Sequence, residues 1–125
     1  MPKYDTLSSP PAPVAVAELR HPETGALFGN LPMLLDTGAD VTLLPRSLIA
    51  QFGIPLGPAQ VYELAGFDGT RSTALGVHLD LVFVGVIFRG RYLVTDQSDG
   101  ILGRDILNHL HLAFNGPKLE WDRIV

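Results

Sequence analysis

The sequence predicts an all-β domain with one or two short helices. Short, largely apolar runs recur along the chain, and clusters of Gly, Pro, Asn and Asp separate them. Only residues 45–52 and 104–110 have the pattern of helices, and both segments are short. A chain of 125 residues is long enough for one domain with its own core.

The first 13 residues differ in composition from the rest, because Ser8, Ser9 and three prolines crowd their second half. We expect residues 1–13 to be a flexible or extended segment and residues 14–125 to be the folded domain. The alternative is an edge strand that crosses to a partner subunit. Pro lacks an N–H group, which makes this segment a poor partner in a β-ladder.

The expected elements then follow in order. The helix at 45–52 begins near Pro45, and Gly53 is its expected C-cap. A second helix is expected at 104–110, with Asp105 as a candidate for capping it. The strands are expected at 14–19, 26–35, 61–64, 71–75, 77–84, 86–95, 101–102, 111–114 and 118–121.

Composition excludes several classes of function. The net charge of −4 argues against nucleic-acid binding, and the absence of cysteine excludes disulfides, thiol catalysis and a Cys-ligated zinc site. No run of 18 apolar residues and no signal peptide is present, so we expect a cytoplasmic protein that does not insert into a membrane. A domain cut from a larger, membrane-bound parent remains the alternative. The 46% hydrophobic content fits a protein that hides extra surface in a dimer.

The most informative motif is Asp36-Thr37-Gly38-Ala39-Asp40, which interrupts two apolar runs. An ionised Asp between strands needs partners or a function. Gly38 permits a tight turn and lets its N–H group approach the Asp36 carboxylate. A capped surface turn is the simpler alternative, but such a turn does not require the apolar Leu34-Leu35 run before it.

This motif resembles the catalytic loop of the retropepsins, the retroviral-type aspartic proteases that work as homodimers. Residues 101–107 resemble the family's second apolar-apolar-Gly element, and Gly66-Phe67-Asp68-Gly69 resemble its flap. A plain hairpin turn is the alternative for residues 66–69, and Asp68 departs from the family's usual flap composition. The resemblance covers residues 14–122.

The resemblance implies an aspartic endopeptidase that has Asp36 of two chains as its catalytic dyad. Two carboxylates in contact hold one proton between them, so one acts as base and the other as acid. Thr37, Gly38 and Ala39 complete the active-site loop, and the Thr37 hydroxyl is expected to bond across the dimer axis. Asp40 is expected to bind substrate and to form a structural ion pair with Arg104.

The predicted partners are a second copy of the chain and an extended peptide or protein substrate, and no cofactor or metal is expected. The flap residues Gly66, Phe67, Asp68 and Gly69 are expected to bind substrate together with Asp40. Apolar side chains are expected to line the cleft: Leu34, Val41, Val84 and Ile87. The alternative function is a proteolytically silent dimerisation or peptide-binding module with the same fold.

The remaining candidates are weaker. His109 and His111 lack a third metal ligand at useful spacing. Trp121 and Phe114 are expected to pack in the core or at the dimer interface. Arg89 and Arg91 alternate along one strand and are most simply a solvated face. The C-terminal segment 119–125 is a candidate for the dimer sheet.

Overall fold

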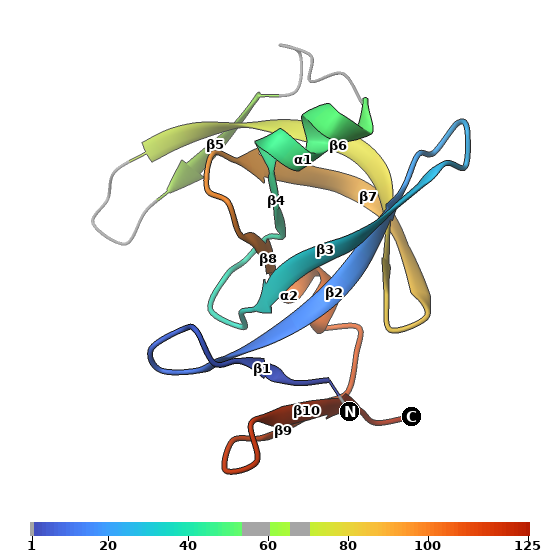
Figure 1. Cartoon of the computed structure of the whole chain (residues 1–125). Helices are drawn as coiled ribbons and strands as arrows, with labels where there is room; N and C mark the ends of the chain where they lie inside the picture. Colours follow the sequence, from blue (N-terminus) through green and yellow to red (C-terminus); the bar gives the residue numbers. More distant parts are fainter. Residues whose placement is uncertain (1, 54–60, 66–70) are drawn as a thin grey trace.

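The structure is a computed structural model that describes residues 2–53, 61–65 and 71–125 (Figure 1). The strands are β1 (Tyr4–Asp5), β2 (Ala12–Arg20), β3 (Leu27–Leu35), β4 (Leu43–Pro45), β5 (Val61–Ala65), β6 (Arg71–Phe83), β7 (Val86–Thr95), β8 (Gly100–Leu102), β9 (Leu112–Asn115) and β10 (Glu120–Arg123). The two helices are α1 (Arg46–Phe52) and α2 (Arg104–Leu107). The predicted all-β class is therefore confirmed.

Six of the strands close into a barrel. The hydrogen-bonded order is β2-β3-β8-β4-β7-β6, and a further pairing of β2 with β6 closes the ring. β1 extends the sheet beside β2, and β5 extends it beside β6. β3 lies parallel to β8, and β4 lies antiparallel to β8 but parallel to β7. The ends of β3, β4 and β8 therefore come together at one place, which is where the candidate site lies.

The core fills the barrel with alternate residues of the long strands, as the two-residue period of a strand requires. Ile49 of α1 and Trp121 of β10 add to it from outside the ring. The fully buried members from the strands include Ala17, Leu19, Leu31, Met33, Leu44, Leu81 and Leu102.

The expected element boundaries are largely confirmed. α1 ends as predicted, because Gly53 adopts a left-handed φ of 83° and donates its N–H to the Ala50 carbonyl at 3.2 Å. β6 is one long strand rather than the two expected around Gly76, since Gly76 pairs with Leu93 of β7 and the ladder continues through it.

The C-terminal elements differ more from the prediction. α2 ends at Leu107 instead of residue 110, and β9 and β10 begin one and two residues later than expected. After α2 the chain tightens into single turns, in which His109 and Leu110 donate to carbonyls three residues earlier. The spacing of apolar residues that predicted a helix up to residue 110 does not distinguish an α-helix from these tighter turns.

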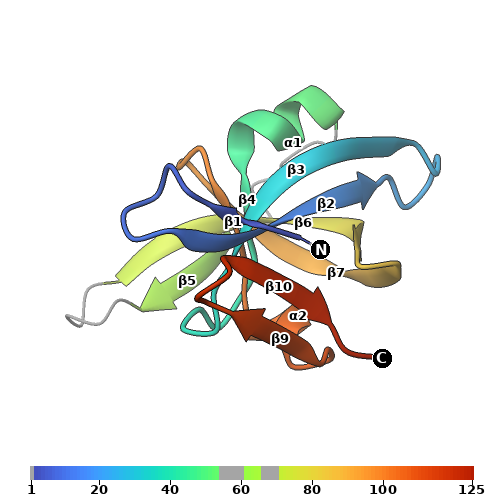
Figure 2. The ribbon, with the colours of Figure 1, turned by 60° about the horizontal axis from the view of Figure 1, so that its bottom comes forward.

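The N-terminal segment makes defined contacts within the chain. β1 pairs with the start of β2, which begins at Ala12 rather than at residue 14. On the other side, the Pro2 carbonyl accepts a hydrogen bond from Trp121 N–H at 3.1 Å, and Tyr4 N–H donates to the Leu119 carbonyl at 2.9 Å. The missing N–H of Pro2 is of no consequence here, because this proline acts as an acceptor. Figure 2 shows β1 beside the β9–β10 hairpin, with both chain ends close by.

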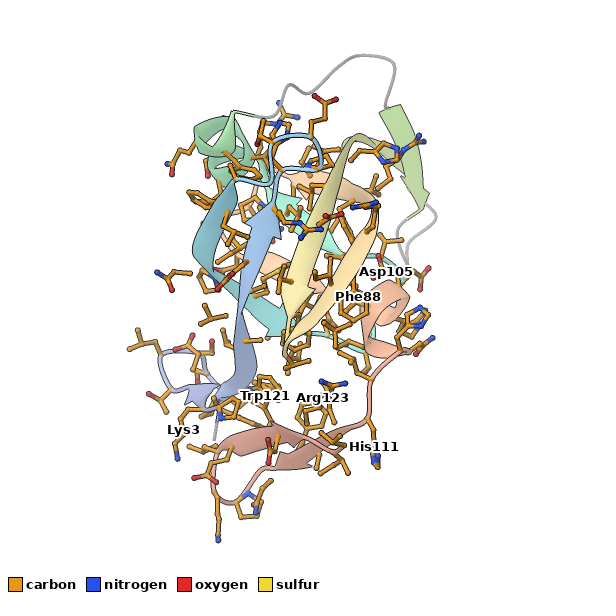
Figure 3. The ribbon with its side chains drawn as sticks, turned by 90° about the vertical axis from the view of Figure 1, so that its right-hand side faces the viewer. Lys3, Phe88, Asp105, His111, Trp121 and Arg123 are labelled. Carbon is orange, nitrogen blue, oxygen red and sulfur yellow. The ribbon has the colours of Figure 1, made fainter. Side chains whose placement is uncertain are left out.

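Trp121 attaches this hairpin to the barrel. Its side chain is 2% exposed, and its indole N–H donates to the Val14 carbonyl at 3.1 Å. Its ring lies 5.8 Å from the ring of Phe83. Figure 3 shows Trp121 and Arg123 between the barrel and the hairpin, and Arg123 donates to the Val84 carbonyl at 2.9 Å. The prediction for Trp121 is confirmed, whereas Phe114 is 46% exposed in the single chain.

Candidate active site

The loop between β3 and β4 holds Asp36 in a tight turn. Gly38 N–H donates to Asp36 Oδ1 at 2.9 Å, as predicted, and Ala39 N–H donates to the Asp36 carbonyl at 3.2 Å. A Cβ atom on Gly38 would lie 3.1 Å from Asp36 Oδ1, closer than most real contacts. The loop therefore combines an Asp side chain bonded to its own backbone with a glycine that leaves room for it.

The end of β8 and the residues that follow it make hydrogen bonds to this loop. Asp36 N–H donates to the Leu102 carbonyl at 3.0 Å, and Arg104 N–H donates to the Ala39 carbonyl at 2.9 Å. The Arg104 guanidinium donates to the Thr37 carbonyl at 2.7 Å and pairs with the Asp40 carboxylate. The predicted Asp40–Arg104 pair is thus present, and the same arginine also holds the backbone of the loop.

The ion pair is exposed within the single chain, because the Asp40 side chain is 81% and the Arg104 side chain 42% accessible. An exposed pair contributes about 0–1 kcal/mol to stability. The two hydrogen bonds from Arg104 to loop carbonyls are consequently the more important contacts in one chain. They fix the loop's shape rather than adding much stability.

Thr42 and Asp105 form the second support, which sequence reasoning did not find. Thr42 is fully buried, and its hydroxyl donates to Asp105 Oδ1 at 2.7 Å while its N–H donates to Asp105 Oδ2 at 3.1 Å. Gly103 N–H donates to the Thr42 hydroxyl oxygen at 3.1 Å. The sequence feature that could have indicated this contact is Thr42 itself, a hydroxyl-bearing residue inside the apolar run 41–44.

The predicted capping role of Asp105 is wrong. The N-cap of α2 is Gly103, and no side chain makes a capping hydrogen bond there. The Asp105 carboxylate instead reaches across to Thr42, 63 residues away in sequence. Asp105 still lies in the first turn of α2, where a negative charge suits the helix dipole.

Gly103 is required by close packing rather than by its backbone angles. Its φ of −95° is open to any residue. A Cβ atom there would lie 2.6 Å from both the carbonyl carbon and the carbonyl oxygen of Val41, a distance that real Cβ atoms do not reach. The two segments can therefore touch only because this residue has no side chain.

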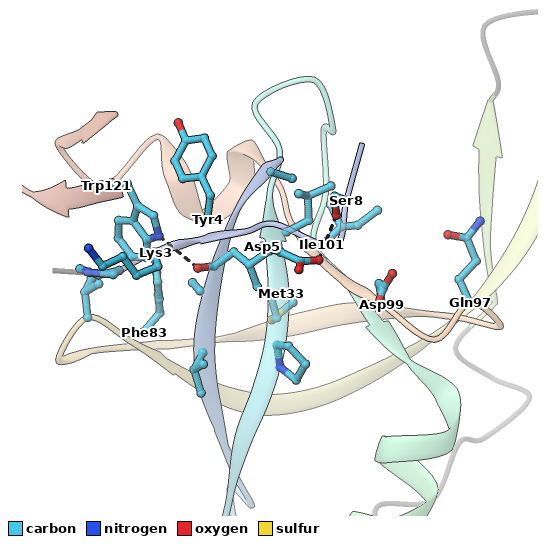
Figure 4. A pocket seen from close by; sticks show the side chains of 18 residues that line it. Lys3, Tyr4, Asp5, Ser8, Met33, Phe83, Gln97, Asp99, Ile101 and Trp121 are labelled. Atoms are coloured by element: carbon cyan, nitrogen blue, oxygen red, sulfur yellow. Dashed lines mark hydrogen bonds between the residues drawn. The ribbon is translucent and has the colours of Figure 1, made fainter. Parts of the chain in front are cut away.

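A cavity of about 950 Å³ lies on the side of the sheet that Leu34 faces (Figure 4). Leu34 and Val84, which we expect to line the substrate cleft, both line this cavity. Val41 and Ile87 were expected there too, but they are not among its lining residues, and Ile87 is 50% exposed on β7.

The flap prediction falls on Gly66, Phe67, Asp68 and Gly69, which lie outside the described residues. The two strands that flank them are described. β5 and β6 are antiparallel, and their pairing extends to Ala65 opposite Arg71. The predicted hairpin is therefore confirmed up to the edge of the predicted flap tip.

A buried carboxylate lies on another part of the barrel and was also missed. Asp80 is fully buried and accepts hydrogen bonds from Arg89 at 2.9 Å and from Arg20 at 2.7 and 2.9 Å. The hydrogen bond from Arg89 lowers the pKa of Asp80, Arg20 adds to this effect, and burial opposes it. Arg89 and Arg91 are exposed as predicted, but Arg89 also neutralises this charge, and Arg91 donates to His78 Nε2 at 3.1 Å.

The described part of the chain contains no group of three or more His, Cys, Asp or Glu side chains placed to hold a metal ion. His109 instead lies near Phe88, with 6.3 Å between ring centroids. Across the same residues, no helix has the length and apolar character needed to cross a membrane.

The fold and site together define an aspartic-protease domain that carries one catalytic-type loop. A family model described as aspartyl protease matches residues 13–106, more than half of the chain. The chain belongs to this family of retropepsin-like aspartyl proteases.

The solved structures include a similar protein, the EIAV protease complexed with the inhibitor HBY-793. It is 26% identical to this chain, with a TM-score of 0.57. The match covers 78% of this chain and 86% of that protein. A comparison with curated protein sequences gives no match.

Proposed function

We propose that this protein is an aspartic endopeptidase in which Asp36 of one chain and Asp36 of a second copy form the catalytic dyad. The observation that carries the proposal is the Asp36 turn itself. It is partly exposed at the ends of β3, β4 and β8, and Leu102, Gly103, Arg104 and Asp105 support the loop that carries it. Each chain has one such motif, so a complete site needs two chains.

The chemistry of the proposed dyad uses one shared proton. The ionised carboxylate takes a proton from a water molecule whose oxygen attacks the peptide carbonyl carbon, while the protonated carboxylate donates its proton to the carbonyl oxygen. When the resulting diol collapses, the carbon–nitrogen bond breaks, the first carboxylate gives its proton to the leaving nitrogen, and the second, now ionised, carboxylate takes a proton from a diol hydroxyl, which leaves a carboxylic acid, an amine and one proton shared by the dyad. No cofactor takes part in this scheme.

The Asp36 side chain is held by a hydrogen bond within its own loop. The N–H of Gly38 bonds to one carboxylate oxygen and fixes its direction. Thr37 is exposed, and we propose that its hydroxyl bonds across the dimer axis to hold the two loops together. The loop is thereby organised before substrate arrives, which is what electrostatic catalysis requires.

Segment 119–125, the candidate for the dimer sheet, is already paired within its own chain. Residues 119–121 already pair with residues 2–4 of their own chain, and β10 pairs along its other edge with β9. β9 pairs only with β10 among the described residues, and its Phe114 is 46% exposed. We propose that the second copy contacts β9, which makes a small interface and a concentration-dependent dimer.

The proposed substrate is an extended peptide, bound as an added strand between the Asp36 loops and the β5–β6 hairpin. Main-chain hydrogen bonds would supply affinity, and side-chain pockets would supply specificity. Asp40 is proposed to contribute to this binding as well as to its pair with Arg104.

The test compares wild type with Asp36→Asn on a mixed peptide library, with cleavage detected by mass spectrometry. The control is Asp96→Asn, because Asp96 is an exposed carboxylate that pairs with Arg46 outside the loop. We expect cleavage by wild type and by the control, and none by Asp36→Asn. Equal cleavage by all three would indicate a contaminating protease. No cleavage by a dimeric wild type would favour the peptide-binding alternative.

A mixing experiment tests the dyad separately. At a chain concentration well above the dissociation constant of the dimer, an approximately tenfold excess of Asp36→Asn chains converts most wild-type chains into heterodimers by mass action. A heterodimer with one Asp36 lacks the acid–base pair, so we expect cleavage to fall about tenfold. An equal mass of an inert protein is the control. Unchanged cleavage would contradict a site shared between two chains.

A further inference from the structure

The cavity beside β3 lies near the loop that carries the candidate catalytic residue, because its lining residue Leu34 precedes Asp36 by two positions in the chain. Successive side chains of a strand point to opposite faces, so Leu34 lines the cavity while Leu35, the last residue of β3, points into the core. Ile101 of β8 lies opposite Leu34 in the ladder and lines the same cavity. A substrate side chain in this cavity would therefore lie near the Asp36 loop.

The floor of this cavity is apolar. Val14, Val16, Leu34, Ile101 and Met33 line it from β2, β3 and β8. Its volume of about 950 Å³ is within the range of ligand sites and exceeds what one side chain fills. A long side chain can therefore lie along the floor together with part of a neighbouring residue.

Among the described residues, one charged side chain that lines the cavity makes no hydrogen bond or ion pair. Lys3 pairs with Glu120, and the Asp5 carboxylate accepts hydrogen bonds from Leu7 N–H and the Ser8 hydroxyl, each at 2.9 Å. Among the described residues, the Asp99 carboxylate has no hydrogen bond or ion pair, although it lines the cavity two residues before Ile101. Figure 4 labels Asp99, Ile101, Ser8 and Asp5 among the residues that line this cavity.

We propose that this cavity takes a lysine or arginine side chain of the peptide substrate, and that Asp99 determines this preference; the proposal rests on the proposed protease function. The aliphatic stem of such a side chain covers Leu34 and Ile101, and its cationic end reaches Asp99. A glutamate at the same position meets an unneutralised carboxylate and is disfavoured. This assignment refines the expectation of apolar substrate side chains. The apolar floor of the cavity binds the aliphatic stem of the side chain, and Asp99 selects for a positive charge at its end.

The experiment uses one cleaved peptide with lysine, norleucine or glutamate at each of three positions on either side of the cut. Norleucine keeps the lysine stem and lacks the ammonium group. At one position, we expect wild type to show a kcat/KM for lysine about fivefold above norleucine, which corresponds to about 1 kcal/mol. Glutamate should fall below norleucine. Asp99→Asn should remove the difference, and the matched control Asp96→Asn, in the same turn and outside the cavity, should keep it.

A binding measurement separates this proposal from the proposed function. Fluorescence anisotropy of labelled lysine and norleucine peptides is measured with Asp36→Asn and with the double variant Asp36→Asn, Asp99→Asn. Tighter binding of the lysine peptide that disappears in the double variant supports the pocket even where no Asp36-dependent cleavage exists. Equal kcat/KM at every position, or a lysine preference that survives Asp99→Asn, overturns the assignment of Asp99.

Discussion

Replacement of Gly103 by alanine tests whether close packing of two backbone segments holds the Asp36 loop. The added Cβ atom would lie 2.6 Å from the carbonyl carbon and oxygen of Val41. Ordinary contact begins near 3.4 Å, so the segments must separate by about 0.8 Å. No side chain can rotate to relieve this contact, because both partners are backbone.

The magnitude follows from this geometry. Overpacking costs about 1–3 kcal/mol when side chains share the strain, and a clash with backbone belongs at the upper end of that range. Because φ at Gly103 is −95°, an alanine suffers no dihedral penalty, and the cost is steric alone. We expect about 3 kcal/mol of lost stability, which lowers the Tm of a domain of this size by roughly 10 °C.

We also expect Gly103→Ala to lower the rate of peptide cleavage, and to do so even at temperatures where the variant is fully folded. A shift of about 1 Å in a catalytic group can cost on the order of a hundredfold in rate. The assay therefore pairs calorimetric melting with Asp36-dependent peptide cleavage at a temperature where circular dichroism shows both proteins folded. Gly116→Ala is the matched control, since a Cβ atom there meets nothing within 4 Å, and its stability should change by less than about 0.5 kcal/mol. A Gly103→Ala protein that melts within about 2 °C of wild type would refute the packing argument.

Three further substitutions test the hydrogen bonds that position the site and its scaffold. Thr42→Val keeps the side chain's shape but removes the hydroxyl that Asp105 accepts from, and we expect a loss of about 1–3 kcal/mol by urea unfolding, largely restored in Thr42→Ser. Trp121→Phe removes the indole hydrogen bond to the Val14 carbonyl, and we expect a loss of about 1–2 kcal/mol by the same measurement. Asp80→Asn should cost about 2 kcal/mol at pH 7, below the range for a fully buried pair because one of its arginine partners is 70% exposed.

The pH dependence of the Asp80 contribution has a definite sign. The folded state lowers the pKa of Asp80, so its contribution is complete above the unfolded-state value of about 3.9 and declines as the pH falls through the folded-state pKa. The stability difference between wild type and Asp80→Asn should therefore shrink below about pH 4. A difference that stays constant from pH 7 to about pH 2 would contradict the role of the ionised carboxylate. For Thr42, equal losses in the valine and serine variants would contradict a hydrogen-bonding role.

Local preferences explain which parts of the fold were predictable. The αL cap at Gly53, the strand Val86–Thr95 and the hydrogen bond from Gly38 to Asp36 each involve residues close together in sequence. Turn-forming residues and apolar alternation report such features directly. The Asp40–Arg104 pair is a long-range contact, and it was predicted only because both residues stand in motifs that resemble a known family.

Sequence alone determined that this chain is a mainly β domain with one Asp-Thr-Gly turn, set in a motif that resembles the catalytic loop of the retropepsins. Only the tertiary structure decided which distant groups satisfy one another: Asp105 with Thr42, Asp80 with Arg20 and Arg89, and the N-terminal residues with Trp121. The physical reason is that local conformational preference depends on neighbours along the chain. A buried hydroxyl, carboxylate or N–H group, in contrast, bonds with whatever the closed barrel brings within reach.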